Sequence, residues 1–161
     1  MRPKVILNCA ASADGKIALS NRQRLKLSNN EDFERVHNLR NKYEAILVGI
    51  GTIIEDDPSL TIDPEYKSAH NPIRIVLDTQ CRTPQNAKIL EGHSKTIIAV
   101  GEKAKTSSIP NVEMIRCGIK EIDIPRLLKE LSNRGIKSIL VEGGETVMWS
   151  FLKKGLFDEF N

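Results

Sequence analysis

The fold is decided by residues 139–152, which read ILVEGGETVMWSFL. The leading aliphatic run is typical of a strand buried on both faces, and Val147, Met148 and Phe151 then recur at helical spacing. Gly143-Gly144 therefore joins a strand to a helix. Glycines let the backbone turn sharply, and the free N–H groups of the helix start offer a phosphate site. The alternative is a plain turn, because one glycine pair is weak evidence.

Other predicted strands also end in small or polar residues. The junctions are Val5–Ala11 with the turn Ser12–Gly15, Ala45–Gly49 with a short helical turn ending at Asp56, and Ile73–Asp78 with Thr79–Arg82. In sheets of parallel strands, ligands bind outside the carboxyl ends. We therefore expect a nucleotide or phosphosugar site where these turns and the Gly-Gly turn meet at one edge.

Strands alternate with helices along the rest of the chain. Further strands are expected at Thr96–Val100 and Val112–Arg116. A capping box at Ser28 and Glu31 predicts a helix to Lys42, and Asp123 with Pro125 predicts another that Gly135 ends. This order predicts an α/β fold, with a mostly parallel central sheet and helices on both faces.

Composition limits the possible functions. The 161 residues suit a single domain, and the net charge of +3 is too small and too evenly spread for a nucleic-acid surface. Cys9, Cys81 and Cys117 have no CxxC spacing, and the histidines stand apart, so we expect neither a disulfide framework nor a bound metal. Without a signal peptide or membrane-length apolar run, we expect a cytoplasmic protein with no membrane partner.

Several motifs together resemble the reductases of riboflavin biosynthesis, which share the dihydrofolate reductase fold. The motifs are S-x-D-G at Ser12, Asp14 and Gly15, L-R at Leu39 and Arg40, G-x-G-T at Gly49, Gly51 and Thr52, D-D-P-x-L-T from Asp56 to Thr61, R-I-V-x-D from Arg74 to Asp78, and V-E-G-G from Val141 to Gly144. They cover nearly the whole chain in order. The resemblance implies a dihydrofolate reductase-like fold.

The resemblance also implies a reaction. Such enzymes reduce a phosphorylated pyrimidine, a pyrimidinone ribosylamine 5′-phosphate, to its ribitylamine with NADPH. The H-x-E and P-C-x-x-C zinc ligands of the deaminase fused to bacterial relatives are absent here. The chain thus resembles the free-standing archaeal and fungal type, which reduces before deamination. A separate deaminase acting first is the alternative.

The resemblance assigns roles to individual residues. Cofactor contacts would come from Ala11, Thr52, Asp56, Thr79 and the segment from Gly144 to Ser150, which includes Glu145 and Thr146. Substrate contacts would come from Arg40, Leu60 and Glu142. Chemically, Gly143-Gly144 and the helix start suit a diphosphate, and Arg40 offers a bidentate fork for the substrate phosphate or else forms an ordinary ion pair. Glu142, at a strand end, would need a partner if buried, such as a substrate N–H.

Cofactor preference rests on the exit of the third strand. Asp78 could bind a ribose 2′-hydroxyl and favour NADH. Thr79, Gln80 and Arg82 instead offer donors for a 2′-phosphate, so NADPH is the favoured cofactor and NADH the alternative. The roles of Arg24 and Lys26 stay open because relatives carry different residues there, and Asp63 replaces a cationic substrate residue of the family.

No residue is assigned as the proton donor. The chain reaches Phe157–Asn161 at the start of another predicted strand, so we expect a single reductase domain over residues 1–161 that lacks the family's last strands, and a homodimer. Two other functions remain open. One is a binding module of the same fold without turnover. The other is a dihydrofolate reductase, disfavoured by an aromatic content of 4% and no clear pterin-binding acid.

Overall fold

A seven-stranded sheet forms the centre of the computed structural model, which describes residues 1–17, 27–63, 71–92, 94–106 and 108–161. The strand order is β5-β4-β3-β2-β6-β1-β7, and every neighbouring pair is parallel. The strands are β1 (Lys4–Leu7), β2 (Ala45–Gly49), β3 (Ile73–Leu77), β4 (Thr96–Val100), β5 (Val112–Arg116), β6 (Ser138–Gly143) and β7 (Glu159–Phe160). The helices are α1 (Asn30–Lys42), α2 (Ile50–Asp56), α3 (Ile124–Asn133) and α4 (Glu145–Lys154), with a 3₁₀ turn η2 (Lys88–Leu90).

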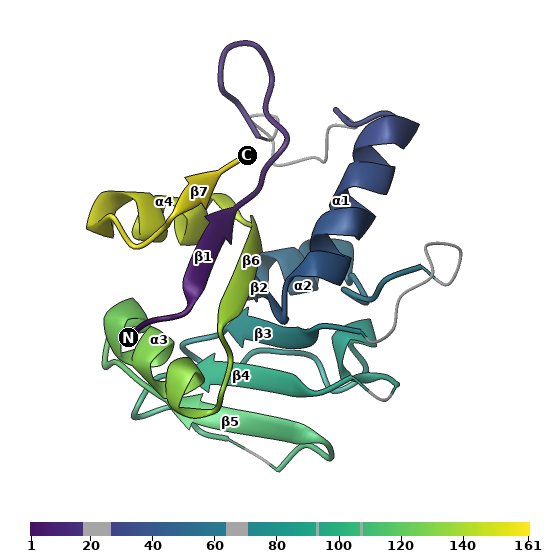
Figure 1. Ribbon diagram of the computed structural model, residues 1–161. Helices are drawn as coiled ribbons and strands as arrows, with labels where there is room; N and C mark the ends of the chain where they lie inside the picture. Colours follow the sequence, from purple (N-terminus) through teal and green to yellow (C-terminus); the bar gives the residue numbers. More distant parts are fainter. Residues whose placement is uncertain (18–26, 64–70, 93, 107) are drawn as a thin grey trace.

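Helices cover both faces of the sheet, with α3 and α4 on one side and α1 and α2 on the other (Figure 1). Successive strand residues point to opposite faces, so Leu47 packs in the cluster under α3 and α4, whereas Ile46 and Val48 pack with α2. Leu140 of β6 packs against Tyr43 at the end of α1. The prediction of a covered, largely parallel α/β sheet is confirmed.

Helix boundaries agree with the sequence at α3 and α4. The Asp123 side chain accepts a hydrogen bond from the Arg126 amide at 3.1 Å, as expected of an N-cap. Gly155 ends α4 in the left-handed conformation. At α1 the predicted capping box is wrong by one residue, because Asn29 is the N-cap and its side chain accepts from the Asp32 amide.

Strand boundaries differ mainly at β1, which ends at Leu7 and not at Ala11. The Asn8 amide still donates to the Val141 carbonyl, but Cys9 turns to the carbonyl of Asn161. The predicted strand after Phe157 is β7, which pairs with β1. Arg2 and the Val5 amide both donate to the Asp158 carboxylate, which fixes β7 at the edge of the sheet.

Arg24 and Lys26 lie outside the described residues. Among the helices of the described ranges, none combines the length and apolar character that a membrane span requires.

Candidate functional site

A large cleft opens at the carboxyl edge of the sheet, with a volume of about 1190 Å³. Its walls come from the segments that follow β1, β2, β3, β5 and β6. Those segments are far apart in sequence but meet at one edge because all the strands are parallel. The predicted turns after β2, β3 and β6 line this cleft as expected, but the turn Ser12–Gly15 after β1 is not among its lining residues.

Most of the residues singled out from the sequence line this cleft. They are Thr52, Asp56, Thr79, Gln80, Arg82, Glu142, Gly143, Gly144, Glu145 and Thr146. Trp149 of the segment from Gly144 to Ser150 is not among its lining residues, nor is Asp78. Ala11, Leu60 and Arg40 are also absent from the lining. Ala11 is exposed just beyond Cys9 and Ala10, which do line it. Leu60 has 3% of its surface exposed and packs in the core beneath α2, and Arg40 lies behind Glu142.

The start of α4 forms the middle of the cleft wall. Gly143 has φ +141°, a conformation that side-chain-bearing residues rarely adopt, and the Gly143–Gly144 peptide bond is cis. Gly144 is the N-cap of α4, and no side chain caps the helix there. A Cβ on Gly144 would lie 3.4 Å from the Thr52 hydroxyl oxygen. The turn therefore presents the first amides of a helix beside a hydroxyl group, with room for a phosphate to approach.

The first turns of α2 supply the neighbouring wall. Thr52 and Asp56 are four residues apart on one face of this helix, and both line the cleft as the spacing predicted. Gly49, just before α2, packs directly under α4: a Cβ there would lie 2.8 Å from Cγ2 of Val147. The small size of Gly49 therefore brings α2 and α4 close together at the cleft.

The exit of β3 is built on Asp78, which is fully buried. Its Oδ2 atom accepts from the Thr83 amide at 2.7 Å and from the Thr83 hydroxyl at 2.8 Å. Asp78 is not among the residues lining the cleft, so its burial argues against the alternative that it binds a ribose hydroxyl. The carboxylate instead shapes the turn that presents Thr79, Gln80 and Arg82 to the cleft.

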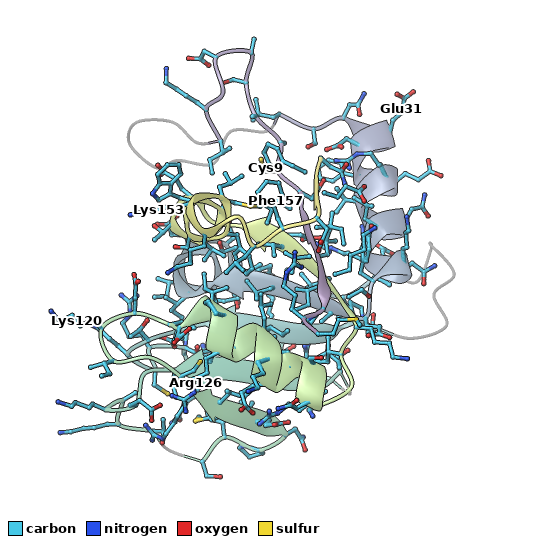
Figure 2. All side chains as sticks on the ribbon, turned by 60° about the vertical axis from the view of Figure 1, so that its left-hand side comes forward. Cys9, Glu31, Lys120, Arg126, Lys153 and Phe157 are labelled. Atoms are coloured by element: carbon cyan, nitrogen blue, oxygen red, sulfur yellow. The ribbon has the colours of Figure 1, made fainter. Side chains whose placement is uncertain are left out.

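A cation that the sequence reasoning missed lies on the loop between β5 and α3. Lys120 extends from this loop (Figure 2) and lines the cleft together with Arg82. Within the described ranges, neither cation pairs with a carboxylate. Lys120 lies in the segment that follows β5, as the other site residues follow their strands. Applying the same strand-end rule to β5 would have singled it out.

Glu142, just before the Gly143-Gly144 turn, forms a bidentate ion pair with Arg40 of α1. Arg40 Nε donates to Glu142 Oε1 at 2.9 Å, and Arg40 Nη2 donates to Oε2 at 2.7 Å. Only 18% of the Arg40 side chain and 10% of the Glu142 side chain are exposed. The partner that Glu142 was expected to need is therefore supplied by the protein itself.

His37, which the sequence left isolated, lies near this ion pair. Its Nδ1 atom accepts from the Asp63 amide at 3.4 Å. Partial burial, with the positive charge of Arg40, lowers the pKa of His37. The negative charges of Asp63 and Glu142 act in the opposite direction. In the ranges that the structure describes, no group of three or more His, Cys, Asp or Glu residues is arranged to hold a metal ion.

Sequence comparison places the chain among known proteins. The RibD C-terminal domain family matches residues 3–161. A 2,5-diamino-6-ribosylamino-4(3H)-pyrimidinone 5′-phosphate reductase of Methanothermobacter thermautotrophicus is 39% identical over 99% of this chain and 76% of its own length. A protein of the same name from Archaeoglobus fulgidus is 37% identical, over 99% of this chain and 78% of its own.

Solved structures show the same architecture. RibD of Acinetobacter baumannii superposes with a TM-score of 0.85 at 27% identity, over 99% of this chain and 45% of that one. The Saccharomyces cerevisiae riboflavin biosynthesis reductase Rib7 gives a TM-score of 0.79 at 26% identity, over 97% of this chain and 69% of that one. The chain therefore spans under half of the bacterial protein and about two thirds of the yeast enzyme.

Proposed function

Because the chain belongs to the RibD C-terminal domain family, we propose that it reduces 2,5-diamino-6-ribosylamino-4(3H)-pyrimidinone 5′-phosphate with NADPH. The product would carry a ribitylamino group in place of the ribosylamino group, a step of riboflavin biosynthesis. Archaeal relatives at 37% and 39% identity carry this reductase name and align with almost all of the chain. The reaction needs a nicotinamide dinucleotide, a phosphorylated sugar and a common cleft for both.

The observation that carries the proposal is the cleft at the carboxyl edge. The strand order puts the segments after β5 and β3 at one end, the starts of α2 and α4 in the middle, and the segment after β1 at the other end. A dinucleotide is an elongated molecule with its diphosphate in the centre. The cleft matches that shape, because its middle contains the uncapped start of α4.

The diphosphate would bind the backbone amides of residues 144–146 and the Thr52 hydroxyl. These amides carry the partial positive charge of a helix N-terminus, which favours an anion. Gly144 has no side chain to fill the space beside Thr52. Asp56, one helical turn beyond Thr52, would accept a hydrogen bond from a hydroxyl or amide group of the cofactor and so orient it.

The preference for NADPH would come from the segments after β3 and β5. Arg82 and Lys120 both line this end of the cleft without a carboxylate partner in the described part of the chain. Two unpaired cations favour a ligand with an extra phosphate over one with a free hydroxyl. Thr79 and Gln80 add neutral donors on the loop after β3, where the one carboxylate, Asp78, is buried and turned to Thr83.

The substrate would bind between the nicotinamide end of the cofactor and Glu142. Leu27 and Phe33 add apolar side chains to the lining of the cleft and would help to exclude water. When bound, the cofactor supplies a hydride for C1′ of the sugar. The protein contributes orientation, since the Glu142 carboxylate can accept hydrogen bonds from substrate N–H or O–H groups. The same proposal has the enzyme acting as a cytoplasmic homodimer.

The test is NADPH oxidation by the purified protein with the pyrimidinone phosphate as substrate. We expect oxidation that depends on the substrate, with a product heavier by two hydrogen atoms. Cofactor binding without oxidation would favour a binding module of the same fold, and oxidation only with dihydrofolate would favour a dihydrofolate reductase. Either result would overturn the proposal. Replacing NADPH by NADH in the same assay tests the cofactor preference, for which we expect a much higher Michaelis constant with NADH.

A further inference from the structure

The loop after β3 is closed into a ring by two residues that do not line the cleft. Asp78 is fully buried, and its Oδ2 atom accepts from both the amide and the hydroxyl of Thr83, at 2.7 Å and 2.8 Å. Thr83 is itself only 7% exposed. Inside the ring, the Cys81 amide donates to the Asp78 carbonyl at 3.0 Å and makes a tight turn. The two bonds to the carboxylate are charge-assisted, which is the stronger class of hydrogen bond in proteins.

The ring divides its side chains into two sets. Thr79, Gln80 and Arg82 line the cleft. Cys81 lies between them in sequence but packs against the core cluster on the α2 side of the sheet. Its backbone is left-handed, with φ +57°, a conformation that is uncommon for residues with a side chain. This turn directs Cys81 inward while the residues on either side of it face the cleft.

A second contact fixes the start of the same loop. The amide of Gly101, just after β4, donates to the Thr79 carbonyl at 3.0 Å. A Cβ on Gly101 would lie 2.9 Å from that carbonyl oxygen, so the two segments touch along their backbones. The Glu102 amide in turn donates to the carbonyl of Gly118, in the segment that carries Lys120. The loop after β3 is therefore held against the segments after β4 and β5.

Recognition of a phosphate needs several donors at fixed positions. If the loop opens, the side chains of Thr79, Gln80 and Arg82 no longer converge. The affinity for an anion then falls in proportion to the fraction of molecules whose loop is closed. A dinucleotide with a free ribose hydroxyl presents no phosphate to these side chains, so its affinity depends far less on the state of the loop.

We propose that Asp78 and Thr83 are positioning residues for cofactor preference: they hold the loop between them in the arrangement that favours NADPH over NADH, and they touch neither cofactor. This inference rests on the proposed function and on the 2′-phosphate site proposed there. The carboxylate at the end of β3 then has a role opposite to the one that its position suggests. It does not select NADH by binding a ribose hydroxyl, but selects NADPH through the loop that it closes.

The experiment measures the dissociation constants of NADPH and NADH by titration calorimetry, in the wild type and in Thr83→Val. Valine has a shape similar to threonine but lacks the hydroxyl, so one bond to Asp78 is lost while the amide bond remains. We expect the dissociation constant of NADPH to rise about fivefold, as it would if about one fifth of the molecules kept a closed loop. That of NADH should stay within about twofold of the wild type. Thr83→Ser keeps the hydroxyl and should bind both cofactors as the wild type does.

A double variant tests whether the effect passes through the loop's cation. In an Arg82→Ala background, adding Thr83→Val should change the dissociation constant of NADPH by less than about twofold, because the main side chain that the loop positions is already gone.

Thr96→Val is the matched control, because it removes another buried threonine hydroxyl at the opposite edge of the sheet. Thr96 begins β4, is 1% exposed, and donates to the Ile89 carbonyl at 2.8 Å. This variant should unfold at lower urea concentration than the wild type but leave the ratio of the two dissociation constants unchanged. If Thr83→Val does not fold, Asp78→Asn takes its place. Asparagine keeps the shape of aspartate but loses the charge that strengthens both bonds, so the same selective loss of NADPH affinity is expected.

Three results would overturn the inference. An unchanged affinity for NADPH would show that the loop holds its arrangement without the hydroxyl bond. Equal losses for NADPH and NADH would indicate a general structural role. A full loss of NADPH affinity on adding Thr83→Val to Arg82→Ala would mean that the two residues act independently. A wild-type protein that binds neither cofactor, or binds both equally, would refute the proposed cofactor preference itself, before any variant is compared.

Discussion

Gly49 gives a direct test of how closely α2 and α4 approach at the cleft. In Gly49→Ala, the new Cβ would lie 2.8 Å from Cγ2 of Val147. Carbon atoms in contact prefer a separation of about 3.5–4.0 Å, so the overlap is about 1 Å. The backbone at Gly49 has φ −86° and ψ 158°, which alanine adopts without strain. The whole cost of the substitution is therefore the collision.

The collision is difficult to relieve by side-chain motion. Val147 is 8% exposed within the core cluster under α4, and a β-branched residue in a helix has one strongly preferred rotamer. Overpacking of this kind costs about 1–3 kcal/mol. If α4 moves to make room, the amides of residues 144–146 move with it. We therefore expect Gly49→Ala to unfold at lower urea concentration and to bind NADPH more weakly.

Substitution of Val147 tests whether the collision with its side chain causes the loss of stability. Val147→Ala alone should cost about 2 kcal/mol for the two methyl groups lost. In Gly49→Ala/Val147→Ala the collision is gone, so the double variant should be close in stability to Val147→Ala. Gly51→Ala is the matched control, because a Cβ there meets no atom within 4 Å and alanine in a helix is favourable by about 0.5–1 kcal/mol. Losses from Gly49→Ala and Val147→Ala that simply add would refute the reasoning.

Three further predictions concern separate parts of the chain. Arg82→Ala should raise the Michaelis constant for NADPH about tenfold with little change for NADH, and equal effects on both cofactors would contradict the assignment. Arg74→Met should lower the free energy of unfolding by about 3 kcal/mol, because Arg74 is 1% exposed and donates to the carbonyls of Glu91 and Ser94. A urea midpoint close to that of the wild type would instead show that water replaces the guanidinium as the donor to these carbonyls. The Arg2 guanidinium, with help from a backbone amide, lowers the pKa of Asp158 from its ordinary 3.8, so its contribution to stability is complete above about pH 4 and disappears as the pH falls through the lowered value. Asp158→Asn should therefore be less stable than the wild type at pH 6 and equal to it in acid, and a constant difference across that range would exclude the carboxylate as the cause.

The sequence predicted the sheet and the cleft from strand ends alone. Near-continuous apolar runs such as Ala45–Gly49 are the signal of strands buried on both faces, and they formed where expected. Once the strands are parallel, their carboxyl ends share an edge. The position of the Gly143-Gly144 turn beside Thr52 follows from that rule, because β2 and β6 are neighbours.

The remaining features depend on contacts between distant segments. No local pattern tells that Arg40 bonds to Glu142, 102 residues away, or that Leu60 turns its side chain into the core. The N-cap of α1 was missed because Ser28 and Asn29 are both good capping residues, and only the backbone geometry chooses between them. Asp78 looked like a ligand for ribose because a carboxylate at a strand end suits that role, yet its Oδ2 atom completes a turn with Thr83.

A crystal structure of the protein grown with NADPH tests the central claim most directly. The account predicts one dinucleotide along the carboxyl edge of the sheet, with its diphosphate within hydrogen-bonding distance of the amides of residues 144–146 and its 2′-phosphate beside Arg82. A cofactor bound at any other surface, or lying in the cleft with its diphosphate away from the start of α4, would contradict it.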